Sequence, residues 1–180
     1  CDAVGFSIGA KGYIGTGWDG AVFYQDFWEW DQASNTWAQK VNFGSMARYL
    51  AVGFSIGTNG YIGTGFDGNY YQDFWEWNQA GNIWSQKANF SGTARSVGVG
   101  FSIGTKGYIG TGYNSNVGYY HQDFWEYDPS INIWTQKVNF PLITCEGIGF
   151  SIGNYGYMGT GTTSISVGTI SDFYQYDPSA

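Results

Sequence analysis

Gly5-Phe6-Ser7-Ile8-Gly9 is the first of four copies of one pentapeptide, and the other three copies begin at Gly53, Gly100 and Gly149. From one copy to the next, the Phe residues are 48, 47 and 49 positions apart. Self-similarity at a period of 20 to 50 residues, roughly, is typical of solenoids, propellers and other repeat architectures. The chain is therefore a tandem array, and its fold follows from one repeat unit.

Three further blocks follow the pentapeptide in a fixed order. The second block, Gly-Tyr-(Ile/Met)-Gly-Thr-Gly, begins at Gly12, Gly60, Gly107 and Gly156. The third block, Asp-Phe-Trp-Glu, begins at Asp26, Asp73 and Asp123, and weakens to Asp-Phe-Tyr-Gln at Asp172. The fourth block, Trp-x-Gln-Lys, begins at Trp37, Trp84 and Trp134 and has no counterpart in the last repeat.

Each block predicts a short strand. Val4, Phe6 and Ile8 alternate with small residues, which is the two-residue period of a half-buried strand. Segments such as Ala10-Lys11-Gly12 have the composition of a tight turn between antiparallel strands. Four short strands in a unit of about 48 residues are the signature of a propeller blade. We therefore expect an all-β, single-domain β-propeller over 1–180, with four blades at 1–48, 49–95, 96–144 and 145–180, the last lacking its outermost strand.

The order of these motifs resembles that of kelch repeats. Tyr-Ile-Gly-Thr-Gly comes first, then the turn Tyr127-Asp128-Pro129, and then Asn-x-Trp-x-x-Lys from Asn132 to Lys137. The chain is especially similar to the secreted bacterial kelch proteins related to the galactose oxidase propeller. It departs from their glycine pair, because Thr16 separates Gly15 from Gly17. The resemblance covers the whole chain and implies the fold, but kelch propellers serve as scaffolds, lectins, isomerases and oxidases.

Composition excludes several classes of partner. Only 12% of the residues are charged, and the net charge of −7 would repel a nucleic-acid backbone. No apolar run reaches the roughly 18 residues that a membrane-spanning helix needs, so we expect no membrane insertion. The kelch resemblance favours a secreted or cell-surface protein that binds a protein or a glycan.

Residues that recur in every repeat predict shared packing. The Phe and Trp residues of the third and fourth blocks are expected in the core, where burial contributes about 2–3 kcal/mol each. Glu29, Glu76 and Glu126 also recur, and three equivalent carboxylates do not converge on one substrate. We expect them to form strand-end hydrogen bonds or to pair with Lys40, Lys87 and Lys137, respectively.

Function is expected where the repeats differ. The connections between second and third strands vary in length, and antiparallel pairing places them on the same face as the links between blades. Aromatic rings beside amides and carboxylates suit a sugar, whose C–H face stacks and whose hydroxyls form hydrogen bonds. The candidate ligand-binding residues are Trp18, Asp19, Tyr24, Arg48, Phe66, Asp67, Tyr70, Arg95, Tyr113, Asn114, Tyr119 and His121. Carbohydrate binding, generic protein interaction and no specific site all stay open.

Catalysis has little support in the sequence. His121 is the single histidine, and a metal site needs a cluster of His, Cys and carboxylate ligands. We therefore expect no catalytic residue, no metal and no cofactor. A sugar-modifying enzyme that uses His121 or the two repeated arginines is one alternative. A self-assembling protein that pairs through the bare edge of blade 4 is another, and a longer array would also explain that edge.

The two cysteines occupy equivalent positions in the first and last repeats. Cys1 precedes Phe6 by five residues, and Cys145 precedes Phe150 by five. In a ring of four blades these positions would be neighbours, within the roughly 4.4–6.8 Å Cα separation that a disulfide tolerates. We expect a disulfide that seals a four-bladed ring, which implies an oxidising compartment. Two free thiols, or a lipid anchor at Cys1, are the alternatives.

Overall fold

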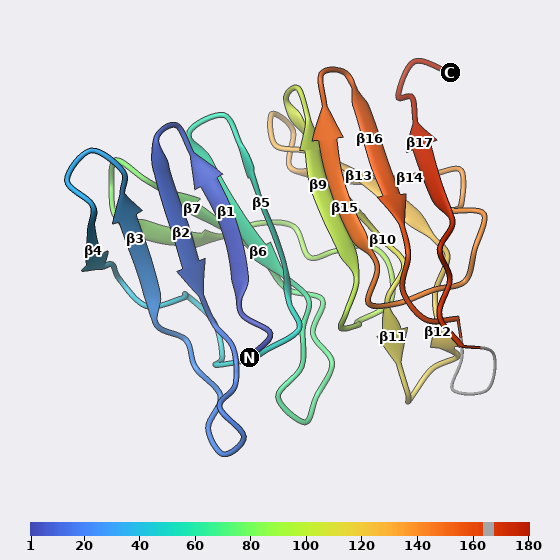
Figure 1. Ribbon diagram of the computed structural model, residues 1–180, viewed down its shortest axis with the longest axis horizontal. Coiled ribbons are helices and arrows are strands. Elements are labelled where there is room, and N and C mark those ends of the chain that lie inside the picture. The colour runs from blue at the N-terminus through green and yellow to red at the C-terminus, as the bar shows by residue number, and fades with distance from the viewer. Residues whose placement is uncertain (164–167) are drawn as a thin grey trace.

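The computed structural model describes residues 1–163 and 168–180, and all the regular structure in these residues is strand (Figure 1). Antiparallel sheets form four successive blades. Blade 1 contains β1 (Val4–Ile8), β2 (Lys11–Gly15), β3 (Phe27–Asp31) and β4 (Thr36–Gln39). Blade 2 contains β5 (Val52–Ile56), β6 (Asn59–Gly63), β7 (Phe74–Asn78) and β8 (Ile83–Gln86). Blade 3 contains β9 (Val99–Ile103), β10 (Lys106–Gly110), β13 (Phe124–Asp128) and β14 (Ile133–Lys137).

Blade 4 has three strands, β15 (Ile148–Ile152), β16 (Tyr155–Gly159) and β17 (Phe173–Tyr176). The prediction of a last blade without its outermost strand is thus confirmed. The loop between the second and third strands of blade 3 adds a small two-stranded ribbon of β11 (Tyr113–Asn114) and β12 (Tyr119–Tyr120). This ribbon projects from the face on which the loops between second and third strands gather (Figure 1).

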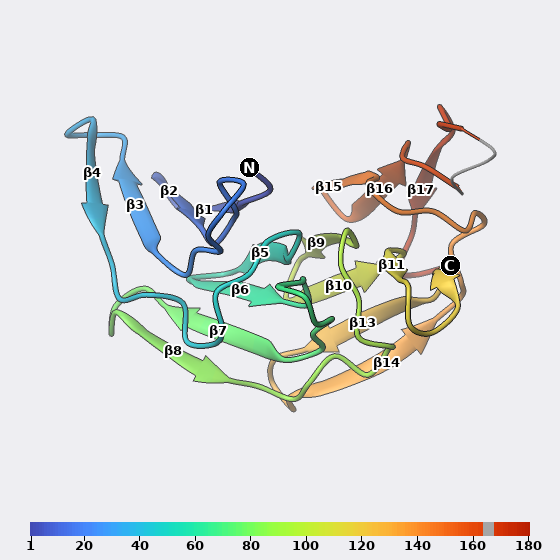
Figure 2. The ribbon, with the colours of Figure 1, turned by 90° about the horizontal axis from the view of Figure 1, so that it is seen from below.

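The blades are arranged as a propeller around the first strand of each. β1, β5, β9 and β15 lie side by side in that order, and the outer strands β8 and β14 line the rim (Figure 2). Backbone hydrogen bonds join successive blades near the axis: the N–H of Leu50 donates to the Asp2 carbonyl (3.1 Å), and that of Val97 to the Leu50 carbonyl (3.0 Å). A third such bond joins the Glu146 N–H to the Val97 carbonyl (3.1 Å).

Repeated glycines allow the blades to pack closely. The ring of Phe54 in blade 2 lies over Gly107 in blade 3, where an added Cβ would come within 2.4 Å of the ring. Val52 covers Gly100 in the same way, at 2.1 Å. One face of each blade therefore carries large apolar side chains, and the facing side of the next blade carries glycine. This pairing explains why both blocks keep their glycines in blades 2, 3 and 4.

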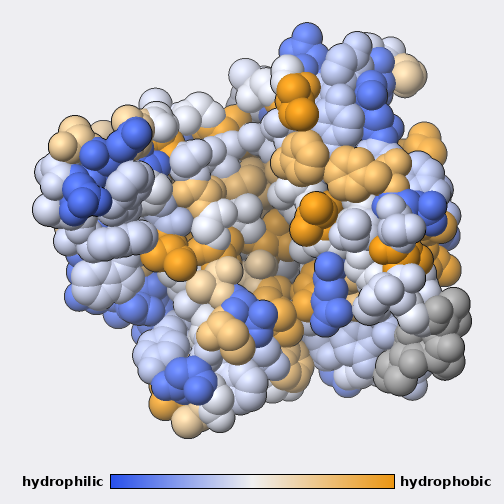
Figure 3. All heavy atoms as spheres, in the orientation of Figure 1, coloured by the Kyte–Doolittle hydropathy of each residue, from blue (hydrophilic) through white to orange (hydrophobic). Residues whose placement is uncertain are grey.

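The four blades follow an arc whose two end blades do not touch (Figure 2). Within the described residues, β1 contacts β5, and β15 contacts β9, but β1 and β15 make no contact with each other. The apolar face of blade 4 is consequently open: Phe150 is 40% exposed, whereas the equivalent Phe54 is 5% exposed. Hydrophobic side chains are visible along β15 in the space-filling view (Figure 3).

The predicted disulfide is wrong. Cys1 and Cys145, both in the described part of the chain, are free thiols, the first exposed and the second buried. They do occupy equivalent positions, because each pairs through its backbone with the start of its own blade's loop, at Trp18 and Thr162. Blades 1 and 4 stand at opposite ends of the arc, so no bond seals a ring between them.

The core confirms most of the packing inferred from repetition. Phe27, Phe74 and Phe124 are buried, and Trp84 and Trp134 are 8% and 6% exposed. The end blades differ: Trp37 in blade 1 and Phe173 in blade 4 are exposed, because no further blade covers them. The predicted Glu–Lys pairs all form, with Nζ–Oε distances of 3.1, 3.0 and 3.2 Å for Lys40–Glu29, Lys87–Glu76 and Lys137–Glu126.

Candidate functional site

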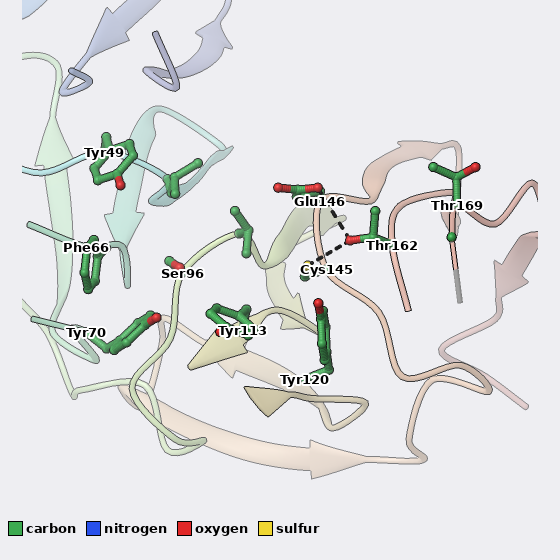
Figure 4. Close-up of a pocket in the computed structure, with 13 residues that line it drawn as sticks. Tyr49, Phe66, Tyr70, Ser96, Tyr113, Tyr120, Cys145, Glu146, Thr162 and Thr169 are labelled. Atoms are coloured by element: carbon green, nitrogen blue, oxygen red, sulfur yellow. Dashed lines mark hydrogen bonds between the residues drawn. The ribbon is translucent and has the colours of Figure 1, made fainter. Parts of the chain in front are cut away.

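A pocket of about 500 Å³ opens on the loop face, between the loops of blades 2, 3 and 4 (Figure 4). One side is lined by aromatic rings from blades 2 and 3, and the other by short polar side chains from blade 4. Its side-chain lining comprises Tyr49, Leu50, Phe66, Tyr70, Ser96, Val97, Tyr113, Tyr120, Cys145, Glu146, Thr162 and Thr169, with Gly168 completing the wall. We call it the aromatic pocket.

The same backbone device positions the walls in each blade. The link that enters a blade pairs with the first residue of that blade's loop, as in the bridges Tyr49–Phe66 and Ser96–Tyr113. Both N–H···O bonds form in each bridge, at 3.0 Å in the first and 2.9 Å in the second. Link and loop side chains from successive blades are therefore held next to one another around the pocket.

The aromatic rings form a continuous series across three blades. It starts with Trp18 and Phe23 in blade 1, whose ring centroids each lie 5.4 Å from that of Tyr49. The following centroid separations are 6.0 Å for Tyr49–Phe66, 4.7 Å for Phe66–Tyr70, 6.2 Å for Tyr70–Tyr113 and 5.2 Å for Tyr113–Tyr120. These are the separations of interacting aromatic pairs. Each ring therefore packs against the next along this wall.

Blade 4 supplies the polar side of the aromatic pocket. The Cys145 Sγ lies 3.3 Å from the Thr162 Oγ1, which in turn donates to a Glu146 carboxylate oxygen at 3.5 Å (Figure 4). Burial raises the pKa of the Cys145 thiol, and the nearby Glu146 charge acts in the same direction. Burial also raises the pKa of the Tyr120 hydroxyl. At neutral pH the Cys145 thiol and the Tyr120 hydroxyl are therefore uncharged hydrogen-bonding groups.

Three of the twelve predicted binding residues line this pocket, namely Phe66, Tyr70 and Tyr113, and Trp18 joins the aromatic series next to it. The Tyr70 hydroxyl donates to the Ser115 hydroxyl at 3.2 Å, which links the loops of blades 2 and 3. The loop face thus carries this pocket, although only part of the predicted set converges there.

The two predicted arginines are not exposed on that face. Arg48 and Arg95 have no exposed side-chain surface, and their guanidinium groups pair with Asp73 and Asp123. The Arg48 guanidinium also stacks 3.9 Å from the centroid of the Tyr71 ring. A buried guanidinium needs hydrogen-bond acceptors for its N–H groups, and here the base of the loop supplies them. The two arginines therefore hold the link that enters a blade against the base of that blade's loop.

The two carboxylates of the predicted set are engaged within their own loops. Asp19 accepts hydrogen bonds from the Tyr24 hydroxyl (2.6 Å) and the Val22 N–H (2.8 Å), and these bonds hold its pKa at about 2. Asp67 accepts from the Tyr71 hydroxyl at 2.6 Å. Asp19, Tyr24 and Asp67 therefore shape the loops of blades 1 and 2 and do not line the aromatic pocket.

The remaining predicted residues lie in the long loop of blade 3. Asn114 is buried and donates through its side-chain amide to the Ala94 carbonyl. Tyr119 is exposed at the loop tip, and its ring is 6.4 Å from that of Tyr113. His121 is half-buried outside the pocket, and burial, with the neighbouring Arg95 charge, lowers its pKa. None of the three lines the aromatic pocket.

The sequence interpretation missed the pocket residues contributed by the links. Tyr49, Ser96 and Cys145 occupy one repeated position, immediately after Arg48, Arg95 and Thr144. The antiparallel topology already placed these links on the loop face, so the residues that differ at this position were the available signal. Thr162 and Thr169 gave no such signal, because their loop resembles no other.

Among the described residues, no group of three or more His, Cys, Asp or Glu side chains is placed to hold a metal ion. No helix long and apolar enough to cross a membrane occurs in the part of the chain that the structure describes.

No protein-family model and no curated protein matches the chain. Among solved structures 177 chains match, so the fold is widely used and does not single out one function. One of them, described as the structure of YjhT, is similar with a TM-score of 0.83 and 18% sequence identity over 98% of this chain. The present chain spans 62% of the length of that one. The likeness establishes the propeller fold, which is consistent with a binding or scaffold module.

Proposed function

We propose that this chain is a non-enzymatic, kelch-type binding module that recognises carbohydrate in the aromatic pocket, on a secreted or cell-surface protein. The observation that carries the proposal is the two-sided lining: rings of Phe66, Tyr70 and Tyr113 stand opposite hydroxyl and carboxylate groups of blade 4. A sugar ring has an apolar C–H face and a rim of hydroxyls, and these two walls match them.

The size and charge of the pocket also support a sugar ligand. About 500 Å³ lies in the range of small-molecule sites, roughly 300–1,000 Å³. Glu146 is the single carboxylate among the described lining residues, and no basic side chain lines the pocket there. A neutral, hydroxyl-rich ligand therefore fits better than an anion, which Glu146 would repel.

The same lining favours binding over catalysis. Hydrolysis of a glycosidic bond usually needs two carboxyl groups on either side of the bond, whereas the described lining offers Glu146 alone. His121, the single imidazole of the chain, is not among the lining residues. We infer that the ligand is held and released unchanged.

The test is binding of a panel of neutral oligosaccharides to the intact chain, followed by titration calorimetry on the best ligand. Replacing Tyr70 and Tyr113 together by Ala should weaken binding by at least about 30-fold, as expected when central aromatic anchors are removed. Trp37→Ala is the matched control, because Trp37 is an exposed aromatic of β4 outside the pocket. Binding that survives the double substitution, or that is lost equally in the control, contradicts the proposed location.

A further inference from the structure

Glu146 carries the single charge in the described lining of the aromatic pocket. Its side chain is exposed and lies across the pocket from Tyr113 and Tyr120 (Figure 4). Burial is the main cause that raises the pKa of the Cys145 thiol and of the Tyr120 hydroxyl, and the Glu146 charge raises both further. The negative charge of Glu146 therefore acts inside the pocket, beside the aromatic rings.

The fold does not require a carboxylate at this position. In blades 2 and 3 the equivalent residues are Leu50 and Val97, which are apolar. The backbone holds the position in the same way in each blade: the Glu146 N–H donates to the Val97 carbonyl (3.1 Å), as the Val97 N–H donates to the Leu50 carbonyl (3.0 Å). The side chain is thus free to differ between blades, as expected of a residue that contacts a ligand and not of one that the repeat needs for packing.

No basic side chain of the chain neutralises Glu146. The sequence has seven Lys and Arg residues, all within the described part of the chain. Each of them forms an ion pair with a carboxylate other than Glu146, and these residues are Lys11, Lys40, Arg48, Lys87, Arg95, Lys106 and Lys137. The charge of Glu146 is therefore available to a positively charged group of a ligand.

The rings of the pocket are likewise not used by the cations of the chain. The guanidinium groups that lie over aromatic rings in the described residues contact Phe43, Tyr71 and Phe90, and none of these three lines the aromatic pocket. The face of an aromatic ring attracts a cation within about 6 Å of its centroid. Rings and carboxylate together therefore favour the same kind of group, an ammonium ion.

A second cavity next to the aromatic pocket has the same sign of charge. It lies at the propeller axis, has a volume of about 390 Å³, and shares Leu50, Val97 and Glu146 with the aromatic pocket. Its charged side chains among the described residues are Asp2 and Glu146, both acidic. A ligand that extends from the aromatic pocket past Glu146 thus enters a space that also attracts a cation.

We propose that Glu146 selects sugars that carry a free, protonated amino group over the same sugars with an acetylated amine. This inference rests on the carbohydrate proposal and names the class of sugar. The sugar ring stacks on the aromatic wall, while its ammonium group donates to the Glu146 carboxylate and lies beside the faces of the tyrosine rings. Hydrogen bonds between two charged groups are stronger than neutral ones, so the amine distinguishes the two sugars.

The experiment is titration calorimetry of the intact chain with two tetrasaccharides of the same linkage, one built of glucosamine and one of N-acetylglucosamine. At about pH 6, where aliphatic amines are protonated, and at low salt, the glucosamine tetramer should bind about tenfold more tightly, the combined effect of an exposed ion pair and a cation–π contact. The difference should shrink in about 0.5 M salt, which screens exposed charges.

Two outcomes separate this inference from the carbohydrate proposal. If the acetylated tetramer binds and the glucosamine tetramer binds no more tightly, the selection by Glu146 is wrong and the carbohydrate proposal stands. If neither tetramer nor any neutral oligosaccharide binds, both are wrong. Displacement of the glucosamine tetramer by an equal concentration of methylammonium ions would mean that the sugar ring contributes nothing, and it too would overturn the inference.

A pair of variants assigns the selection to one residue. Glu146→Gln removes the charge but keeps an oxygen that can accept the hydrogen bond from the Thr162 hydroxyl. In this variant the glucosamine tetramer should bind about fivefold more weakly, and binding of the acetylated tetramer should not change. Asp172→Asn is the matched control, because it removes the same charge from an exposed residue of blade 4 outside the pocket, and it should change neither affinity. Equal losses in the two variants, or an equal loss for both sugars in Glu146→Gln, overturn the proposal.

Discussion

Arg95 and Asp123 form a buried ion pair with two parallel hydrogen bonds, 2.6 Å between Nη1 and Oδ1 and 2.8 Å between Nη2 and Oδ2. The Arg95 Nη1 also donates to the Thr111 carbonyl at 2.8 Å. Thr111 lies just before the loop that carries Tyr113, so the pair fixes the start of that loop. Arg48 and Asp73 do the same in blade 2. The walls of the aromatic pocket are thus held in place by charged pairs that do not themselves line the pocket.

Replacing Arg95 by Met should lower the free energy of unfolding by about 3–5 kcal/mol, because it leaves the Asp123 carboxylate largely buried without a counter-charge. Urea denaturation followed by tryptophan fluorescence measures the change. Lys106→Met is the control, since it removes the more exposed Lys106–Asp128 pair, and its cost should be about 0–1 kcal/mol. Similar losses in the two variants would show that Arg95 is not a structural anchor.

Stability should fall on acidification in two stages. Burial alone would raise the pKa of Asp123, but hydrogen bonds and charge from Arg95 outweigh it and lower the pKa; Asp73 is lowered in the same way by Arg48. A carboxyl with a lower pKa in the folded state stabilises fully above its unfolded pKa of about 3.9. That contribution disappears as the pH falls from there through the folded pKa.

His121 accounts for the earlier stage. Burial lowers its pKa, so the unfolded chain, with a histidine pKa of about 6.5, binds this proton first. Urea midpoints measured between pH 7 and pH 3 should decline below about pH 6.5 and more steeply below about pH 4. His121→Gln should remove the first decline and keep the second. A flat profile down to pH 3 would contradict both assignments.

Repetition predicted the fold because each blade meets the same packing problem, and residues such as Phe74 and Gly107 solve it in each copy. The same reasoning applied to Arg48 and Arg95 would have placed them in the structural set, since they too recur. Their partners follow 25 and 28 residues later in the chain, and no short-range pattern reveals such a pairing. The angle between successive blades likewise depends on how their aromatic side chains pack against one another. The sequence positions of the two cysteines therefore could not show that the blades form an open arc.

The residues of the aromatic pocket were also predicted only in part, because some of them come together only in the folded chain. Differences among the loops singled out Phe66, Tyr70 and Tyr113, and all three line the aromatic pocket. Tyr49 and Thr162 come from a link and from the loop of blade 4. They join the pocket only through the bridges that pair link with loop, which depend on tertiary structure.

Gly107→Ala should destabilise the protein by about 1–3 kcal/mol, the usual cost of an added methyl group in a filled interface. The added Cβ would lie 2.4 Å from the ring of Phe54, which is itself buried and unable to move aside. Thermal unfolding followed by circular dichroism measures the loss.

Gly12→Ala is the matched control for that substitution. Gly12 is the equivalent residue in blade 1, where the nearest atom to an added Cβ is 3.7 Å away. The variant should unfold at or slightly above the wild-type temperature, because Ala has less freedom than Gly in the unfolded chain. An equal loss in both variants would mean that another blade or chain covers the open face of blade 1 in solution.

The two cysteines should react as free thiols at different rates. Cys1 is exposed, whereas Cys145 is buried and its thiol pKa is raised by burial, so less thiolate is present there to react. Alkylation at pH 7.5 followed by peptide mass analysis should label Cys1 first and Cys145 slowly, and a bound sugar should slow Cys145 further because that residue lines the aromatic pocket. In the Cys145→Ser variant, the labelling rate of Cys1 should be unchanged, since the two residues lie in blades that do not touch. A non-reduced sample with no alkylatable thiol would instead require the two end blades to meet, and the open arc would be wrong.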